Sequence, residues 1–143
     1  MHKALEQARL AEESGEVPVG AVIVHNDKVI AACHNLRETL GDPTAHAEIL
    51  ALREAANLLG TRRLSGCSMY VTLEPCPMCA GAIVMANLDT CIFAAWDEKQ
   101  GCCGSLYDIP HDPAFTHRTE VIGGILEVEA TTLIKDFFAQ KRI

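Results

Sequence analysis

Basic residues are scarce in this sequence of 143 residues. Lysine and arginine together number 12 against 19 aspartates and glutamates, which leaves a formal net charge of −7 at pH 7. Binding to the phosphates of a nucleic acid requires local positive charge. The composition therefore argues weakly against a nucleic-acid partner, although a local basic patch on an acidic protein stays compatible with one.

Long apolar runs are also missing, so we expect no segment that crosses a bilayer and no membrane partner. The opening residues, Met1-His2-Lys3, lead into a polar, helix-like stretch rather than into a secretory signal. The cysteines number seven, which is odd. Free thiols or metal thiolates in a reducing cytoplasm explain them better than a disulfide framework does, so we expect a cytoplasmic protein.

No repeat, low-complexity tract or linker divides the chain. Its residues are 49% hydrophobic and 22% charged, the ordinary balance of a globular protein. A chain of this length can bury a core without disulfides. We therefore expect a single domain over residues 1–143.

Hydrophobic periodicity and turn residues predict a helix, a hairpin and then alternating strands and helices. Asn26 and Asp27 tolerate left-handed backbone, which predicts the tight turn of the hairpin. Asp42 as N-cap and Pro43 at the first helical position predict the start of the second helix, which Gly60 ends. The expected helices cover residues 2–13, 43–59, 78–86 and 126–138, the strands 17–24, 28–33, 68–73, 91–96 and 120–123, and the loops 35–41 and 97–113. Helices on both faces of one central sheet give the most economical packing.

Two short stretches carry the chemistry, His46-Ala47-Glu48 and Pro75-Cys76-Pro77-Met78-Cys79. Zinc binds imidazole nitrogen and thiolate sulfur in a tetrahedron of four ligands. We expect one zinc ion per chain, bound by His46, Cys76 and Cys79. Three protein ligands leave one position open, which is typical of a catalytic zinc site. Glu48 is then the candidate acid and base for a water in that position.

Both stretches are expected at helix N-termini, where side chains lean beyond the helix end and can converge on one metal. Each also has a plainer interpretation. The two cysteines alone could form a buried or redox pair, and Glu48 alone could simply favour the helix dipole. A non-catalytic zinc module would need a fourth protein ligand, for which His34 is the only spare candidate. The remaining five cysteines are expected to be small packing residues.

Together these motifs resemble the signature of the zinc deaminases. Longer matching stretches narrow the resemblance to the bacterial tRNA-specific adenosine deaminases, and the likeness runs from about residue 4 to residue 142. The stretches that carry it are residues 17–22, 42–48, 71–82, 104–106 and 137–138. The resemblance implies a three-layer α/β/α cytidine-deaminase-like fold with a five-stranded mixed sheet, working as a homodimer. It also implies hydrolytic conversion of a wobble adenosine to inosine, with Asn35 hydrogen-bonding the purine. The alternative is a free-base or nucleoside deaminase acting on guanine, cytosine or cytidine.

The expected substrate is a tRNA anticodon stem-loop, because material for RNA contacts lies around the site. RNA loops are bound by stacking splayed bases on aromatic or arginine side chains. The candidate substrate-binding residues are Asn35, Arg37, Asp97, Lys99, Phe137 and Phe138, with further cations at Lys135, Lys141 and Arg142. For the last helix the alternative is core packing by the phenylalanine pair, with a solvated basic end.

Overall fold

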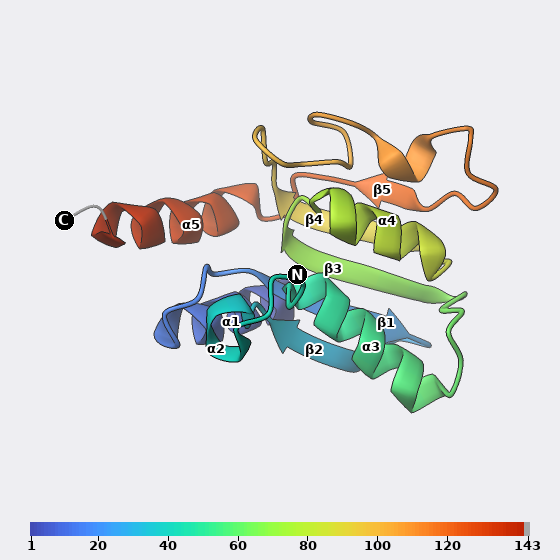
Figure 1. Ribbon diagram of the computed structural model, residues 1–143, viewed down its shortest axis with the longest axis horizontal. Coiled ribbons are helices and arrows are strands. Elements are labelled where there is room, and N and C mark those ends of the chain that lie inside the picture. The colour runs from blue at the N-terminus through green and yellow to red at the C-terminus, as the bar shows by residue number, and fades with distance from the viewer. Residues whose placement is uncertain (142–143) are drawn as a thin grey trace.

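The computed structural model describes residues 1–141. Its five strands form one sheet, which helices cover (Figure 1). Arg142, one of the expected cations, lies outside the described residues. The helices are α1 (His2–Glu13), α2 (Arg37–Leu40), α3 (Ala47–Leu59), α4 (Pro77–Met85) and α5 (Glu127–Lys141), with a 3-10 turn at Ile109–His111. The strands are β1 (Gly20–His25), β2 (Lys28–His34), β3 (Cys67–Leu73), β4 (Thr90–Ala95) and β5 (Glu120–Ile122). None of the helices within residues 1–141 is long and apolar enough to cross a membrane.

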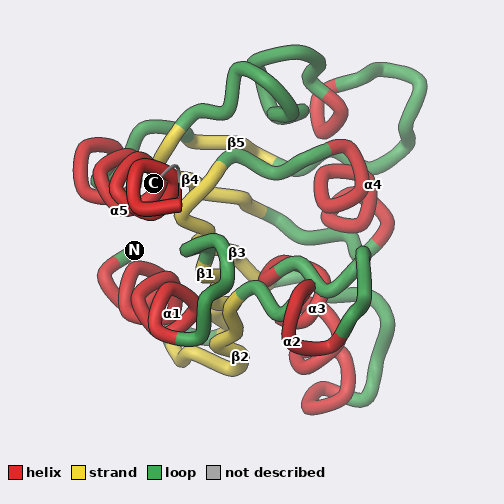
Figure 2. The backbone as a smooth tube through the Cα atoms, turned by 60° about the vertical axis from the view of Figure 1, so that its left-hand side comes forward, coloured by secondary structure: helices red, strands yellow, loops and turns green. Residues whose placement is uncertain are grey.

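The sheet is mixed, with the strand order β2-β1-β3-β4-β5. Strand β1 is antiparallel to both β2 and β3, whereas β3, β4 and β5 run parallel. Parallel neighbours need a crossover connection, which α4 supplies between β3 and β4. Figure 2 shows α1 and α5 on one side of the sheet and α3 and α4 on the other. The expected three-layer α/β/α fold is confirmed.

The hairpin between β1 and β2 turns where the sequence predicts it. Asn26 and Asp27 have φ values of 51° and 61°, so both adopt the left-handed backbone that a two-residue hairpin loop demands. The strands on either side pair in antiparallel register from Gly20 opposite His34 to His25 opposite Lys28. The hairpin places the end of β2, and hence Asn35, beside the start of β1.

The core lies around β3 and β4, the central parallel pair. Met69, Val71 and Phe93 are fully buried and share one cluster with Ile83 of α4. Strand β4 is a nearly continuous apolar run, as expected for a strand covered on both faces. This packing fixes the carboxyl ends of β3 and β4, from which the loops of the site emerge.

The second predicted helix starts later than the sequence suggests. The Asp42 carboxylate accepts hydrogen bonds from the amide and the hydroxyl of Thr44, both at 2.8 Å, so it closes a turn of its own. Helix α3 begins at Ala47, and its N-cap is His46. The expectation of Asp42 as the N-cap is therefore wrong. The expected loop over residues 35–41 likewise contains the short helix α2.

Candidate active site

At the two helix N-termini of the site, the residue in the N-cap position makes no capping hydrogen bond with its side chain. His46 precedes α3 and Cys76 precedes α4, both in extended backbone and neither with a side-chain hydrogen bond to its helix. Serine, threonine, aspartate or asparagine at an N-cap is worth about 0.5–2 kcal/mol over alanine. The chain gives up that stabilisation at both helices, which leaves the imidazole and the thiol free to face each other.

The distances between the donor atoms fit a tetrahedral zinc ion. His46 Nδ1 lies 3.6 Å from Cys76 Sγ and 3.5 Å from Cys79 Sγ, and the three donor atoms all lie within 4.8 Å of one another. Zn–N bonds of about 2.0–2.1 Å and Zn–S bonds of about 2.3 Å place nitrogen and sulfur about 3.6 Å apart in a tetrahedron. Within residues 1–141, no other cluster of three or more His, Cys, Asp or Glu donors is this close.

Among residues 1–141, no fourth His, Cys, Asp or Glu joins this group. His34, the only spare candidate from the sequence, is not part of it, and its Nδ1 lies 2.9 Å from the carbonyl oxygen of Asn35. Glu48 is also outside the donor group. The described residues therefore do not supply the four donors of a closed structural zinc site, and a metal held by this group would keep one position open.

Proton sharing within the donor group favours a thiolate. The pKa of the Cys76 thiol is lowered to about 4 because the Cys79 thiol donates a hydrogen bond to it and His46 lies beside it. That hydrogen bond and burial raise the pKa of Cys79, and the contact with Cys76 raises the pKa of His46. Metal binding requires deprotonated thiols and a neutral imidazole, so metal affinity depends on pH.

Glu48 lies in the first turn of α3, two residues beyond His46. It is only 4% exposed, and burial raises the pKa of its carboxyl group above the ordinary value. A carboxyl group whose pKa is shifted toward neutrality can both accept and return a proton near pH 7. Glu48 therefore lies beside the donor group, and its acid and base role stays a prediction.

A pocket of about 1040 Å³ opens above these residues. It lies at the carboxyl ends of the parallel strands β3 and β4, the usual position for a ligand site in a sheet of this kind. One face of α5 forms the opposite wall. Of the residues expected at the site, Asn35, Arg37, His46, Glu48, Cys76, Asp97, Lys99 and Phe138 line the pocket. Cys79 lies buried behind Cys76 and does not line it.

Asn35 enters the pocket from the end of β2 with its amide held in place. Its Oδ1 accepts a hydrogen bond from the Arg37 amide at 3.1 Å, and its Nδ2 donates to the carbonyl of Val17 at 3.4 Å. The residue is 6% exposed. Both groups of the side chain are therefore oriented before any ligand arrives.

On the far side of the pocket, Asp97 shapes the loop that carries Lys99. Its carboxylate accepts hydrogen bonds from the amides of Lys99 and Gln100 at 3.0 and 3.1 Å. In α5 the two phenylalanines separate: Phe138 lines the pocket and is 44% exposed, whereas Phe137 is buried and does not line it. Their rings meet edge to face with centroids 5.3 Å apart, so Phe137 supports Phe138 from behind.

Comparison with known proteins identifies the family. A family model described as MafB19-like deaminase matches residues 1–142. The tRNA-specific adenosine deaminase of Bacillus subtilis (strain 168) is 49% identical over 142 residues, covering 99% of this chain and 88% of that relative. The chain belongs to the tRNA-specific adenosine deaminase family.

Two solved structures are similar to the chain, and the one with the higher TM-score agrees with this assignment. One, described as a study of A-to-I editing by tRNA:A34 deaminases at the wobble position of transfer RNA, has a TM-score of 0.90 at 43% identity, covering 93% of this chain and 96% of that one. A guanine deaminase from Bacillus subtilis is less similar, with a TM-score of 0.66 at 32% identity, covering 99% of this chain and 91% of that one.

The pocket of this deaminase also contains a buried carboxylate that the sequence analysis missed. Glu74 follows β3 and is only 2% exposed. It accepts hydrogen bonds from the amides of Asp97, Cys103 and Ser105 at 2.9–3.0 Å, and also from the Ser105 hydroxyl. Gly101 packs so closely on Glu74 that a Cβ there would collide with its carboxylate. The sequence feature that could have indicated this residue is its position, directly after a buried strand and directly before Pro75-Cys76.

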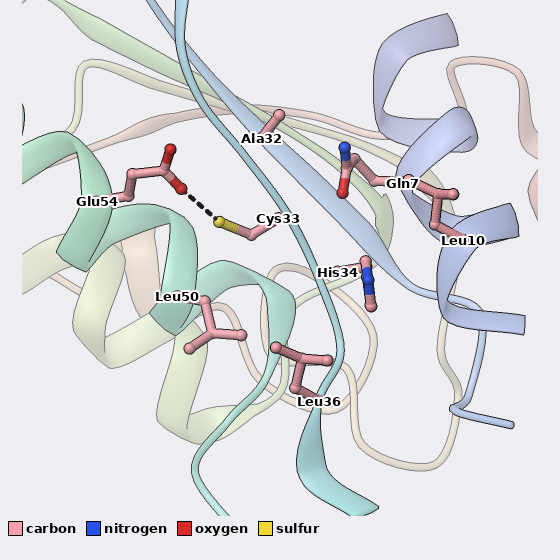
Figure 3. A pocket seen from close by; sticks show the side chains of 8 residues that line it. All are labelled: Gln7, Leu10, Ala32, Cys33, His34, Leu36, Leu50 and Glu54. Carbon is pink, nitrogen blue, oxygen red and sulfur yellow. Dashed lines mark hydrogen bonds between the residues drawn. The ribbon is translucent and has the colours of Figure 1, made fainter. Parts of the chain in front are cut away.

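A second pocket, of about 450 Å³, lies between α1, β2 and α3 (Figure 3). Its most reactive residue by type is Cys33, whose thiol donates a hydrogen bond to Glu54 at 2.9 Å. Burial, together with Glu54, raises the pKa of Cys33 to about 12, so the thiol is protonated at neutral pH. A protonated thiol is a poor nucleophile and metal ligand, and the donor group at His46 remains the candidate active site.

Proposed function

We propose that the protein hydrolyses the wobble adenosine of a tRNA anticodon to inosine with one zinc ion per chain. The observation that carries the proposal is the tetrahedral donor spacing of His46, Cys76 and Cys79 beside the buried Glu48, at the base of a pocket that extends to α5. The similarity to tRNA-specific adenosine deaminases over nearly the whole chain supports the choice of substrate.

His46, Cys76 and Cys79 are the proposed zinc ligands, because their side chains meet at the spacing that zinc requires. When bound, zinc supplies a Lewis acid that brings the pKa of water to about 7. The two thiolates balance the charge of the ion, so the centre is formally neutral and suits a closed pocket.

Glu48 is the proposed proton carrier. It accepts a proton from the attacking water and delivers it to a ring nitrogen of the adenine. It then takes the second proton, from the new hydroxyl on the attacked carbon, and passes it to the departing amine, which leaves as ammonia. Adenosine and water are thereby converted to inosine and ammonia, and Glu48 returns to its starting state. Proton transfer by a positioned group of this kind contributes about 10²–10⁴-fold in rate, and its raised pKa suits a group that both accepts and donates.

The remaining pocket residues are proposed to bind the RNA. The target base must leave the stack to reach the donor group, and Asn35, whose amide is already oriented, is proposed to hydrogen-bond the purine. Arg37, Asp97, Lys99 and Phe138 surround the route to the site. Phe137 would act only by supporting Phe138. A homodimer in the cytoplasm, as the family resemblance and the cysteine content suggest, is part of the same proposal.

The second candidate is a free-base deaminase, which the similarity to a guanine deaminase favours. The lining of the pocket argues against a free-base substrate, because α5 and the loop after β4 extend the pocket wall well beyond the donor group. A single base, held at Asn35, His46 and Glu48, would not need that extension.

The test offers four substrates in parallel: a tRNA with a wobble adenosine, guanine, cytosine and cytidine. We expect inosine formation on the tRNA alone. The Glu48→Gln variant, whose zinc content is measured in the same preparation, should form inosine slower by about 10²–10⁴-fold or more. Efficient turnover of guanine or cytidine without activity on tRNA would contradict the proposal.

A further inference from the structure

The chain has a single tryptophan, and it stands at the rim of the pocket. Trp96 follows β4 directly and lines the same pocket as His46 and Glu48, yet it is 47% exposed whereas Glu48 is 4% exposed. Large aromatic side chains normally lie in the core, or at binding surfaces where their area is covered by a partner. Trp96 thus forms part of the outer wall of the pocket, whereas Glu48 lies at the base of the pocket.

The indole is held firmly from behind. Phe93 meets it edge to face with ring centroids 4.7 Å apart and an interplanar angle of 89°. Two glycines let the backbone approach its edge: a Cβ at Gly123 would lie 2.8 Å from Trp96 Cζ2, and a Cβ at Gly104 would lie 3.2 Å from Cζ3. A side chain that is already immobilised loses little entropy when a ligand covers it.

The charges around the pocket do not supply a strong phosphate site. Arg37, Lys99 and Lys135 line it, but so do the acidic side chains of the rim, Asp97, Glu98 and Glu127. Affinity for a polyanion through charge alone is correspondingly limited. Base stacking on an aromatic side chain does not depend on net charge, and every base has a face that can stack.

We propose that Trp96 stacks a nucleobase that flanks the target adenosine in the anticodon loop. The target base has to reach the buried Glu48, so the base on the outer wall is a neighbour of the target. This inference rests on the proposed RNA substrate and adds a contact outside the zinc centre. Because stacking tolerates any base, Trp96 contributes affinity and loop orientation rather than a choice of sequence.

Tryptophan fluorescence tests the proposal directly, since the wild-type chain contains no other tryptophan. The zinc-loaded protein is titrated with an anticodon stem-loop that carries a wobble adenosine, while a labelled copy of the RNA reports binding by anisotropy. We expect saturable quenching of the emission with the same midpoint as binding. Trp96→Ala should weaken binding about 5- to 150-fold, the equivalent of one stacked base, and Trp96→Phe should weaken it less.

Tyr107→Ala is the matched control. Tyr107 is a 70% exposed aromatic residue that does not line the pocket, so its removal should leave affinity and quenching unchanged. Loops with one abasic nucleotide at a time identify the stacked base, and quenching should disappear at one position beside the wobble adenosine. Bound and deaminated RNA with unchanged emission would overturn the stacking alone. Absence of any RNA binding would overturn the proposed function together with it.

Discussion

At the scale of single residues, His46 and Cys76 occupy N-caps where an oxygen-bearing side chain would stabilise the helix better. Their sulfur and nitrogen atoms instead converge at the spacing of a tetrahedral metal. Helix capping and metal binding can be separated experimentally at position 76, because serine has nearly the size of cysteine and caps a helix well.

Cys76→Ser should therefore lose zinc while the metal-free protein stays folded. The serine hydroxyl can accept a hydrogen bond from an amide at the start of α4. The free energy of unfolding of the metal-free variant should therefore equal that of the metal-free wild type or exceed it by up to about 1 kcal/mol. Zinc content by atomic absorption and thermal unfolding in chelator give the two readouts. Cys67→Ala, at a buried cysteine outside the site, should retain one zinc per chain. Full zinc occupancy in a Cys76→Ser, Cys79→Ser double variant would refute the ligand assignment.

Glu48→Gln separates proton transfer from metal binding. The amide fills the same buried space but cannot carry a proton, so turnover on tRNA should fall by about 10²–10⁴-fold or more. Zinc content and the thermal midpoint should change little, because Glu48 is not in the donor group. The matched control is Glu54→Gln, an exposed glutamate on the same helix. Loss of zinc in proportion to activity would instead make Glu48 a ligand.

At the scale of elements, hydrophobic periodicity predicted all five strands and the four long helices to within a few residues. Element boundaries were harder where a side chain competed for the backbone. Asp42 satisfies Thr44 rather than a helix, and α2 forms because a distant carboxylate, Glu16, accepts hydrogen bonds from its amides. No local pattern reveals a partner 22 residues away.

Glu16 makes the short helix α2 sensitive to acid. Burial acts to raise the pKa of this carboxyl, but hydrogen bonds from Thr39 and from the Glu38 amide outweigh burial and lower the pKa below its ordinary value of 4.5. Its contribution to stability is therefore complete above pH 4.5 and is lost as the pH falls through the lower folded-state pKa.

Glu16→Gln should remove this acid-sensitive part of the stability. Urea midpoints measured from roughly pH 3 to pH 7 should fall more steeply toward low pH in the wild type than in the variant. The exposed Glu13→Gln serves as control and should follow the wild type. Parallel curves for the wild type and Glu16→Gln would show that Glu16 does not carry the effect.

Glu74 holds the loop after β4 by accepting hydrogen bonds from its backbone amides, as Glu16 does for α2. Its Oε2 accepts the amides of Cys103 and Ser105, so an amide nitrogen at that position would face two donors. Each buried donor left unpaired costs about 1–3 kcal/mol. Glu74→Gln should therefore lower the free energy of unfolding by about 2 kcal/mol or more, as measured by urea denaturation. The exposed Glu98→Gln in the same loop should have little effect on stability.

At the scale of the whole molecule, the sequence predicted which donor side chains the structure brings together but not the shape of the pocket around them. His46, Cys76 and Cys79 lie in two compact motifs, so local spacing was sufficient. The pocket wall is built from the β2–α2 segment, the loop after β4 and one face of α5. These segments meet only because the sheet order places them at one edge. The same packing buries Phe137 and leaves Phe138 exposed.

The same arrangement limits how much of the RNA affinity can be electrostatic. Only Arg37, Lys99 and Lys135 among the lysines and arginines of residues 1–141 line the pocket, in a protein with a net charge of −7. Each phosphate neutralised on a single strand contributes a log–log salt slope of about −0.7, so three cations predict a slope no steeper than about −2. Stem-loop binding measured at several salt concentrations gives this slope. Lys135→Gln should make it shallower by about 0.7, whereas Arg9→Gln, on α1 and outside the pocket lining, should leave it unchanged. A much steeper slope would require phosphate contacts beyond the pocket, and a flat one would leave stacking on Trp96 and Phe138 as the main source of affinity.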